Sequence, residues 1–73
     1  MIGEISQGSK VSIKIQLKEY KGQNYVDVRK HFLSDQKQWI PMKKGISIPV
    51  SQLSEAITLL GQAEYQLKKG AKI

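Results

Sequence analysis

Cations and aromatic side chains concentrate between residues 10 and 44, and they are the groups of this sequence best suited to recognise a ligand. The segment holds nine Lys and Arg residues against three acidic residues, so it accounts for the whole formal net charge of +6. A localised positive field attracts polyanions, and neighbouring aromatic rings offer surfaces on which unstacked bases can lie. The combination predicts contact with single-stranded nucleic acid. The alternative is a basic surface that serves only solubility.

The candidate contacts form two chemical groups. The cations that could neutralise phosphates are Lys14, Lys18, Arg29, Lys43 and Lys44. The aromatic side chains that could stack on bases are Tyr20, Phe32 and Trp39. Packing is the commoner role of aromatic residues in a small domain, and strict alternation along the strand places Phe32 among core residues. Tyr25 and Tyr65 are interpreted as structural.

The residue types give little support to catalysis, a metal site or a cofactor. The chain has no Cys and one His, and no glycine-rich phosphate loop is present. His31 is expected to be a solvated or phosphate-contacting residue of a strand. Asp27, two residues before Arg29 on the same side, is expected to orient the guanidinium by a salt bridge. We therefore expect a protein that binds without chemistry.

Two strands must position most of these side chains. Residues 10–20 alternate strictly, with Val11, Ile13, Ile15 and Leu17 on one side and polar residues on the other. Residues 21–24 supply turn chemistry, and a second strand is expected at 25–33. Its valines should share the core side, which leaves Arg29 on the basic side with the lysines.

The remaining elements complete a sheet and a helix. Short strands are expected at residues 39–42 and 46–48, with a turn at 43–45, and Pro41 suits an edge or bulge. After Pro49 the apolar period changes to about 3.6, which predicts a helix over residues 50–69 that could break near Gly61. The expected fold is α+β, with a four-stranded antiparallel curved sheet (residues 10–48) before a C-terminal helix that covers one face. Residues 1–9 are expected to be a flexible terminus of this single domain, residues 1–73.

Length and composition bear on the expected oligomeric state and cellular location. A 73-residue chain without disulfides buries a thin core, so a homodimer is a reasonable expectation. No stretch approaches a membrane span, and the first nine residues lack the order of a secretion signal. We expect a cytoplasmic protein, associated with the nucleoid or, if the source is viral, in the host cytoplasm.

Three segments carry a resemblance to a known family. They are Lys-Glu-Tyr-Lys-Gly at 18–22, Tyr-Val-Asp-Val-Arg at 25–29 and Pro-Met-Lys-Lys-Gly-Ile-Ser-Ile at 41–48. In order and spacing they resemble the single-stranded DNA-binding domain of the transcriptional coactivator positive cofactor four, over roughly residues 11–60. The resemblance implies a homodimer whose helices help build the interface and whose curved sheets form channels for two single strands of opposite polarity.

By position, the resemblance implies DNA contacts at Lys18, Tyr20, Lys21, Arg29, Phe32, Lys43 and Lys44. The family's aromatic residue at the Phe32 position stacks on a base, so a bulge near Lys30 or His31 is expected to turn Phe32 to the basic side. The sequence departs from the family at Met42, Val50 and Leu53, around the last turn and the helix start. The acidic and Ser-rich extension of eukaryotic members is missing, so a compact prokaryotic or viral type is the nearer match.

The function expected is sequence-tolerant binding of single-stranded DNA in transcription, replication or recombination, with contacts to proteins of those processes as further partners. Two alternatives stay open. The same face could bind RNA, with the 2′-hydroxyl as the discriminating group. The basic sheet could instead dock an acidic protein partner, as an adaptor without affinity for oligonucleotides.

Overall fold

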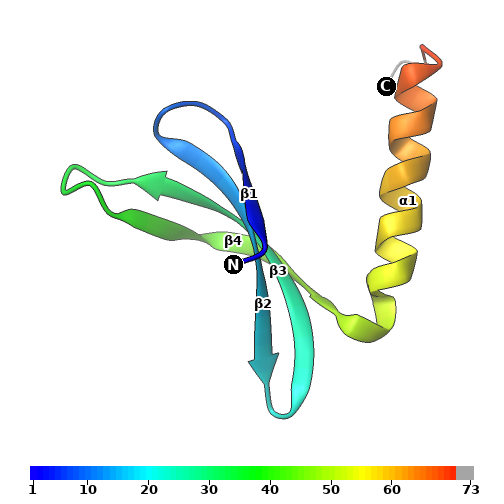
Figure 1. Ribbon diagram of the computed structural model, residues 1–73, viewed down its shortest axis with the longest axis horizontal. Helices are drawn as coiled ribbons and strands as arrows, with labels where there is room; N and C mark the ends of the chain where they lie inside the picture. The colour runs from blue at the N-terminus through cyan, green and yellow to red at the C-terminus, as the bar shows by residue number, and fades with distance from the viewer. Residues whose placement is uncertain (71–73) are drawn as a thin grey trace.

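Four antiparallel strands form one sheet, and a single helix follows them (Figure 1). The computed structural model describes residues 1–70. The strands are β1 (Gly3–Ser6), β2 (Val11–Tyr20), β3 (Gln23–Leu33) and β4 (Trp39–Pro49), and each pairs with its neighbours in sequence order. The helix α1 spans Val50–Lys68. The α+β class and the β-β-β-β-α order predicted from the sequence are therefore confirmed.

The hairpin of β2 and β3 defines the two sides of the sheet. Ile15 pairs with Val28, whereas Lys14 pairs with Arg29, and the register continues without interruption from Val11 to Tyr20. Paired residues lie on the same side, and successive residues lie on opposite sides. The polar face therefore carries Ser12, Lys14, Gln16, Lys18, Tyr20, Asp27, Arg29, His31, Trp39, Gly45 and Ser47. The apolar face carries Ile5, Val11, Ile13, Ile15, Leu17, Val26, Val28, Phe32, Ile46 and Ile48.

The turn between β2 and β3 is shorter than expected. Only Lys21 and Gly22 lie outside the strands, and both have positive φ, at 52° and 79°. Two-residue turns with positive φ at both positions match the twist of paired strands, and glycine adopts that conformation at no steric cost. The turn thus holds Tyr20 and Lys21 at the tip of the hairpin.

One strand replaces the two short strands and the turn expected between residues 39 and 48. Gly45 pairs with Arg29 and Pro41 with His31, so three residues of β4 stand opposite the single residue Lys30. We call residues 42–44 the β4 bulge. The expectation of a turn at 43–45 was wrong because a bulge absorbs the extra residues while the strand continues. Pro41 lies in the edge strand of the sheet, as predicted.

The first residues belong to the sheet. β1 pairs with β2 through Glu4 opposite Lys14 and Ile5 opposite Ile13. The Ser12 hydroxyl donates a hydrogen bond of 2.7 Å to Glu4 Oε1. The flexible terminus expected for residues 1–9 is therefore corrected: a short strand with only one clear apolar position gives a weak signal, and its pairing partner supplies the order.

The helix begins directly after β4 and stands away from the sheet (Figure 1). Its 19 residues span about 28 Å, and it continues through Gly61 without a break. Among the strands of residues 1–70 it contacts β3 and β4, and Leu53 and Ala56 are half-buried where they approach the sheet. None of its residues is buried, and within residues 1–70 no helix is long and apolar enough to span a bilayer.

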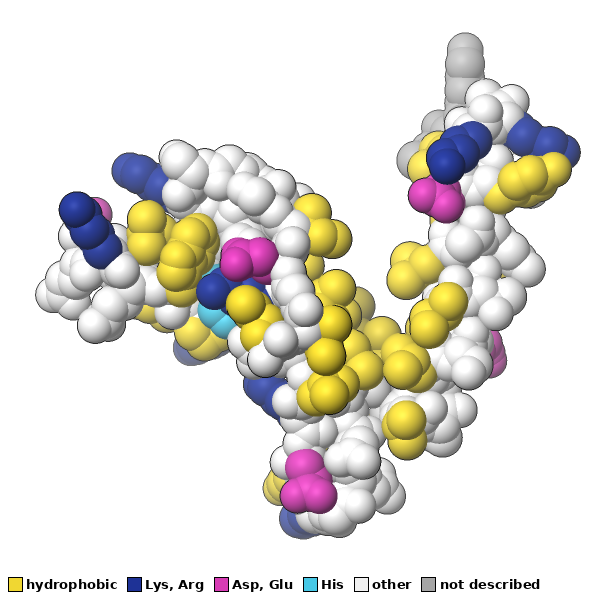
Figure 2. Space-filling model, viewed as in Figure 1, with side chains coloured by type: hydrophobic (Ala, Val, Ile, Leu, Met, Phe, Trp, Pro, Cys, Tyr) yellow, Lys and Arg dark blue, Asp and Glu magenta, His cyan; other side chains and the backbone are white. Residues whose placement is uncertain are grey.

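The helix does not cover the apolar face, which corrects the arrangement expected from the sequence. Leu17 is 68% exposed and Ile46 is 62% exposed, and no hydrophobic side chain among residues 1–70 is buried. Figure 2 shows hydrophobic side chains on both arms of the V formed by sheet and helix. The helix follows β4 directly at Pro49 and points outward, so its apolar residues meet those of the sheet only near its first turns, around Leu53 and Ala56.

Candidate nucleic-acid interface

The polar face brings together five of the nine predicted contact residues. Lys14, Lys18 and Tyr20 come from β2, Arg29 comes from β3, and Trp39 comes from the start of β4. Their grouping follows from the alternation of β2 and the uninterrupted register with β3. Lys21 lies beside them in the hairpin turn.

Two pairs of a cation and an aromatic ring stand apart on this face. Lys14 Nζ lies 5.1 Å from the centroid of the Trp39 ring, and Lys21 Nζ lies 5.4 Å from that of Tyr20. Lys14 and Tyr20 are six residues apart along β2, which corresponds to about 20 Å. Each pair offers a charge for a phosphate and a ring for a base within one small area.

A shallow pocket adjoins Tyr20 on the polar face. It has a volume of about 310 Å³ and is lined by Lys18, Glu19, Tyr20, Tyr25 and Ser47. The Tyr25 hydroxyl donates a hydrogen bond of 3.1 Å to Gln23 Oε1, which leaves the ring beside the pocket. Tyr25 was interpreted as structural from the sequence. The sequence did contain a signal that Tyr25 lies on the polar face. This residue is an even number of residues from Arg29 in the same strand, and it pairs with Lys18.

Asp27 is the most deeply buried charged side chain of the face, with 2% of its surface exposed. It accepts two hydrogen bonds of 3.2 Å from Arg29 and one of 3.1 Å from the Ser47 hydroxyl, and Lys18 Nζ lies 3.6 Å away. The predicted salt bridge between Asp27 and Arg29 is therefore confirmed. Burial raises the pKa of the Asp27 carboxyl, but these hydrogen bonds and the charges of Lys18 and Arg29 outweigh it, so the pKa lies below its ordinary 3.8.

Phe32 lies on the apolar face. It pairs with Val11 and with Ile40, and no irregularity interrupts β3 against β2. The bulge expected in β3 near Lys30 or His31 exists at that level of the sheet, but its extra residues belong to β4. Phe32 therefore keeps the side that strict alternation assigns to it, and the expectation that a bulge turns it to the basic side was wrong. Phe32 remains 38% exposed.

Lys43 and Lys44 both lie exposed in the β4 bulge, and they have different neighbours. Lys43 lies two residues before Gly45, and Gly45 is on the polar face. Lys44 lines a shallow pocket with Ile13, Val28 and Lys30 among others. A role for Lys44 in the same contact surface as Lys14 stays a prediction.

His31 is 8% exposed, and its Nδ1 lies 3.2 Å from the backbone oxygen of Arg29. The expectation of a solvated or phosphate-contacting histidine is corrected, because β1 and β4 flank the sheet centre where His31 pairs with Ser12 and Pro41. Within residues 1–70 no group of three or more His, Cys, Asp or Glu could hold a metal ion.

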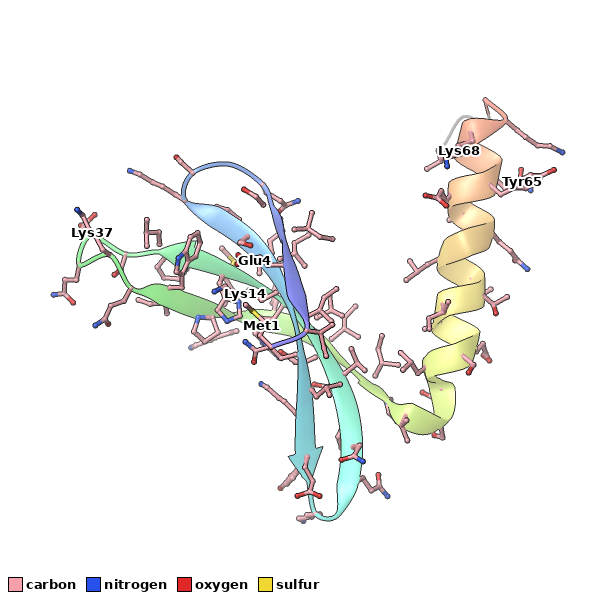
Figure 3. All side chains as sticks on the ribbon, in the orientation of Figure 1. Met1, Glu4, Lys14, Lys37, Tyr65 and Lys68 are labelled. Carbon is pink, nitrogen blue, oxygen red and sulfur yellow. The ribbon has the colours of Figure 1, made fainter. Side chains whose placement is uncertain are left out.

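The positive surface is distributed over the sheet, and acidic groups occur singly. Figure 3 shows Lys14 next to Glu4 near the centre of the sheet and Lys37 at the far tip of the β3–β4 hairpin. Tyr65 and Lys68 lie at the distal end of α1, where Lys68 pairs with Glu64 at 3.8 Å. Exposed pairs of that kind contribute little to stability.

Known proteins resemble this chain in both sequence and fold. Residues 6–58 match the family described as Transcriptional Coactivator p15 (PC4). The crystal structure of a PC4 homologue from Burkholderia pseudomallei K96243 is 30% identical, covers 86% of this chain and 85% of its own, and superposes with a TM-score of 0.80. The bacteriophage T5 homologue of the eukaryotic transcription coactivator PC4, implicated in recombination-dependent DNA replication, shares the fold at 17% identity, 93% and 80% coverage and a TM-score of 0.60. No curated protein sequence matches the chain.

Proposed function

Because the chain belongs to the PC4 family, we propose that it binds single-stranded DNA on the polar face, without catalysing a reaction. The observation that carries the proposal is the placement of two cation and aromatic pairs, Lys14 with Trp39 and Lys21 with Tyr20, along one face of a basic sheet. The cations release counterions from the phosphate backbone, and the rings stack on bases. Every nucleotide offers a phosphate and a base that can stack, so binding should depend little on the DNA sequence.

The protein acts as a homodimer in this proposal. Support comes from the apolar face, where Leu17 and Ile46 remain more than 60% exposed, and from α1, where Leu60 is 70% exposed. Apolar side chains exposed together on one face are typical of an interface. A second copy would cover both the sheet and the helix, and it would present a second polar face to another segment of DNA.

Transcription, replication and recombination are the processes in which we place this activity. The support is the coactivator family and the phage homologue implicated in recombination-dependent replication. Melted DNA occurs in all three processes, and a protein without sequence preference can serve any of them.

Fluorescence anisotropy tests the proposal with labelled single-stranded DNA, duplex DNA and RNA of equal length, each titrated at two salt concentrations. We expect tightest binding to single-stranded DNA, weakened by added salt, because duplex bases are already stacked and phosphate contacts release counterions. A preference for RNA would favour the alternative that the polar face binds RNA and recognises its 2′-hydroxyl groups. Absence of binding to all three would favour the acidic protein partner.

A further inference from the structure

The guanidinium of Arg29 is occupied by the protein itself. Nε and Nη2 each donate a hydrogen bond of 3.2 Å to Asp27, and Nη1 donates to the backbone oxygens of Met42 and Lys43 at 2.8 and 2.7 Å. A guanidinium has five N–H groups, and these contacts use four of them. The side chain is 18% exposed. Only one N–H group of Arg29 therefore remains available to bind a phosphate.

The two backbone oxygens belong to the β4 bulge. A bulge takes residues out of the regular ladder, and their polar groups need other partners. Arg29 supplies those partners for Met42 and Lys43 from the neighbouring strand. The guanidinium therefore ties the bulge to β3 at the point where the register shifts.

Gly45 makes room for this arrangement. It pairs with Arg29, and a Cβ on Gly45 would lie 2.5 Å from Arg29 Cζ and 2.9 Å from Nη1. Any other residue at this position would displace the guanidinium from the bulge oxygens. The requirement for glycine comes from this close approach and not from a positive φ.

Asp27 holds the guanidinium from the opposite side. Its carboxylate is 2% exposed, and it also accepts the hydroxyl of Ser47, which lies in β4 beyond Gly45. The network thus joins β3 to β4 on both sides of the shift, through Ser47 on one side and Met42 and Lys43 on the other. Lys43 is exposed and bears its charge next to the bonded backbone oxygen.

We propose that Arg29, braced by Asp27 and accommodated by Gly45, is a positioning residue that shapes the β4 bulge so that Lys43 presents its charge to the DNA backbone. Arg29 then serves binding through Lys43 and does not itself contact phosphate. This inference rests on the proposed function and assigns a different role to a residue that the sequence suggests as a direct contact.

Two variants that keep the net charge test whether Arg29 shapes the β4 bulge. Arg29→Lys retains the cation but loses the planar fork, and Gly45→Ala moves the guanidinium without changing any charge. We expect each to weaken binding of single-stranded DNA about fivefold and to reduce the salt slope by about 0.7, as loss of one phosphate contact would. Wild-type affinity and slope in both variants would overturn the proposal, because either change should release the β4 bulge from Arg29.

A double-mutant cycle provides the second readout. Combined with Lys43→Ala, Arg29→Lys should add no further loss, because both changes remove the same contact. Combined with Lys21→Ala, in the hairpin turn at the other end of the face, the two losses should multiply. Multiplying losses with Lys43→Ala would overturn the positioning role. Circular dichroism and light scattering verify the fold and the oligomeric state of each variant.

Ser47→Ala serves if the stronger variants do not fold. It removes one hydrogen bond from Asp27 and leaves Arg29 and its charge in place. A smaller loss of affinity that disappears in the Lys43→Ala background supports the proposal, and an unchanged affinity contradicts it. If the wild-type protein fails to bind single-stranded DNA, the proposed function fails first. If the wild type binds and the variants match it, only the positioning role fails.

Discussion

The two faces of one sheet differ in what they bury. Among residues 1–70 only three side chains are buried, and Ser12, Asp27 and His31 all lie on the polar face. On the apolar face, Leu17 and Ile46 are 68% and 62% exposed. Soluble domains ordinarily show the reverse. The difference indicates that hydrogen bonds organise the polar face within a single chain, whereas the apolar face stays uncovered in a single chain, which fits the proposed homodimer.

The largest expected effect tests the apolar side of this comparison. Leu60 lies seven residues after Leu53, on the same side of α1, and is 70% exposed in one chain. Leu60→Asp should therefore weaken the proposed homodimer by about 2–3 kcal/mol, because it removes a side chain that the proposed interface would bury and adds a charge. Sedimentation equilibrium measures the change.

Ser54→Asp is the matched control, since it adds the same charge at an exposed polar position of the helix. Its dimer should resemble that of the wild type. A monomeric wild-type protein, or equal dissociation of both variants, would contradict the interface.

The second prediction tests the polar side. Asp27→Asn should lower the free energy of unfolding by about 1.5–3 kcal/mol, because hydrogen bonds to charged groups contribute that much and Arg29 loses its buried counter-charge. Urea denaturation provides the measurement. Glu19→Gln is the control, since Glu19 is exposed on the same hairpin. Equal stability of the two variants would show that the buried network does not organise the face.

The third prediction contrasts aromatic residues of the two faces. Tyr20→Ala should weaken binding of single-stranded DNA by about 1–3 kcal/mol, with little change in salt slope, because it removes a stacking surface and no charge. Phe32→Ala should leave the affinity close to that of the wild type, since Phe32 lies on the apolar face. Anisotropy titrations of both variants decide the matter. A greater loss from Phe32→Ala would assign base stacking to the opposite face.

The smallest effect concerns pH. The folded pKa of Asp27 lies below its ordinary 3.8, so the unfolded chain takes up the proton first as the pH falls. The stability that Asp27 contributes is fully present above the unfolded pKa and is lost as the pH falls through the folded pKa. Urea midpoints measured between pH 6 and pH 2 should decline less in Asp27→Asn than in the wild type. Parallel curves would show that Asp27 is not the titrating group.

The alternation of apolar and polar residues was sufficient to predict which side chains of β2 and β3 share a face. The alternation of Ile13, Lys14 and Ile15 predicted both sides of the hairpin, and the spacing of Asp27 and Arg29 predicted their salt bridge. These features depend on neighbours in one strand or on one short turn. Local geometry therefore determines them.

Longer-range features were not predictable in the same way. The strand β1 depends on pairing with β2, and the position of the bulge depends on which of two strands absorbs extra residues. The family resemblance predicts Phe32 on the basic side, whereas the structure retains the alternation that places it on the apolar face. A one-residue difference between paired strands reverses a face, and sequence spacing alone does not say which strand carries it.

The sequence by itself determined the class of fold, the polar and apolar sides of the central hairpin and the basic character of one region, because alternation and charge are properties of the chain. Only the tertiary structure decided that the helix stands away from the sheet, that Trp39 meets Lys14, and that Arg29 is bonded to the β4 bulge. Each of these depends on distances between residues of different elements. Such distances are set by strand register and by the direction in which β4 leads into α1.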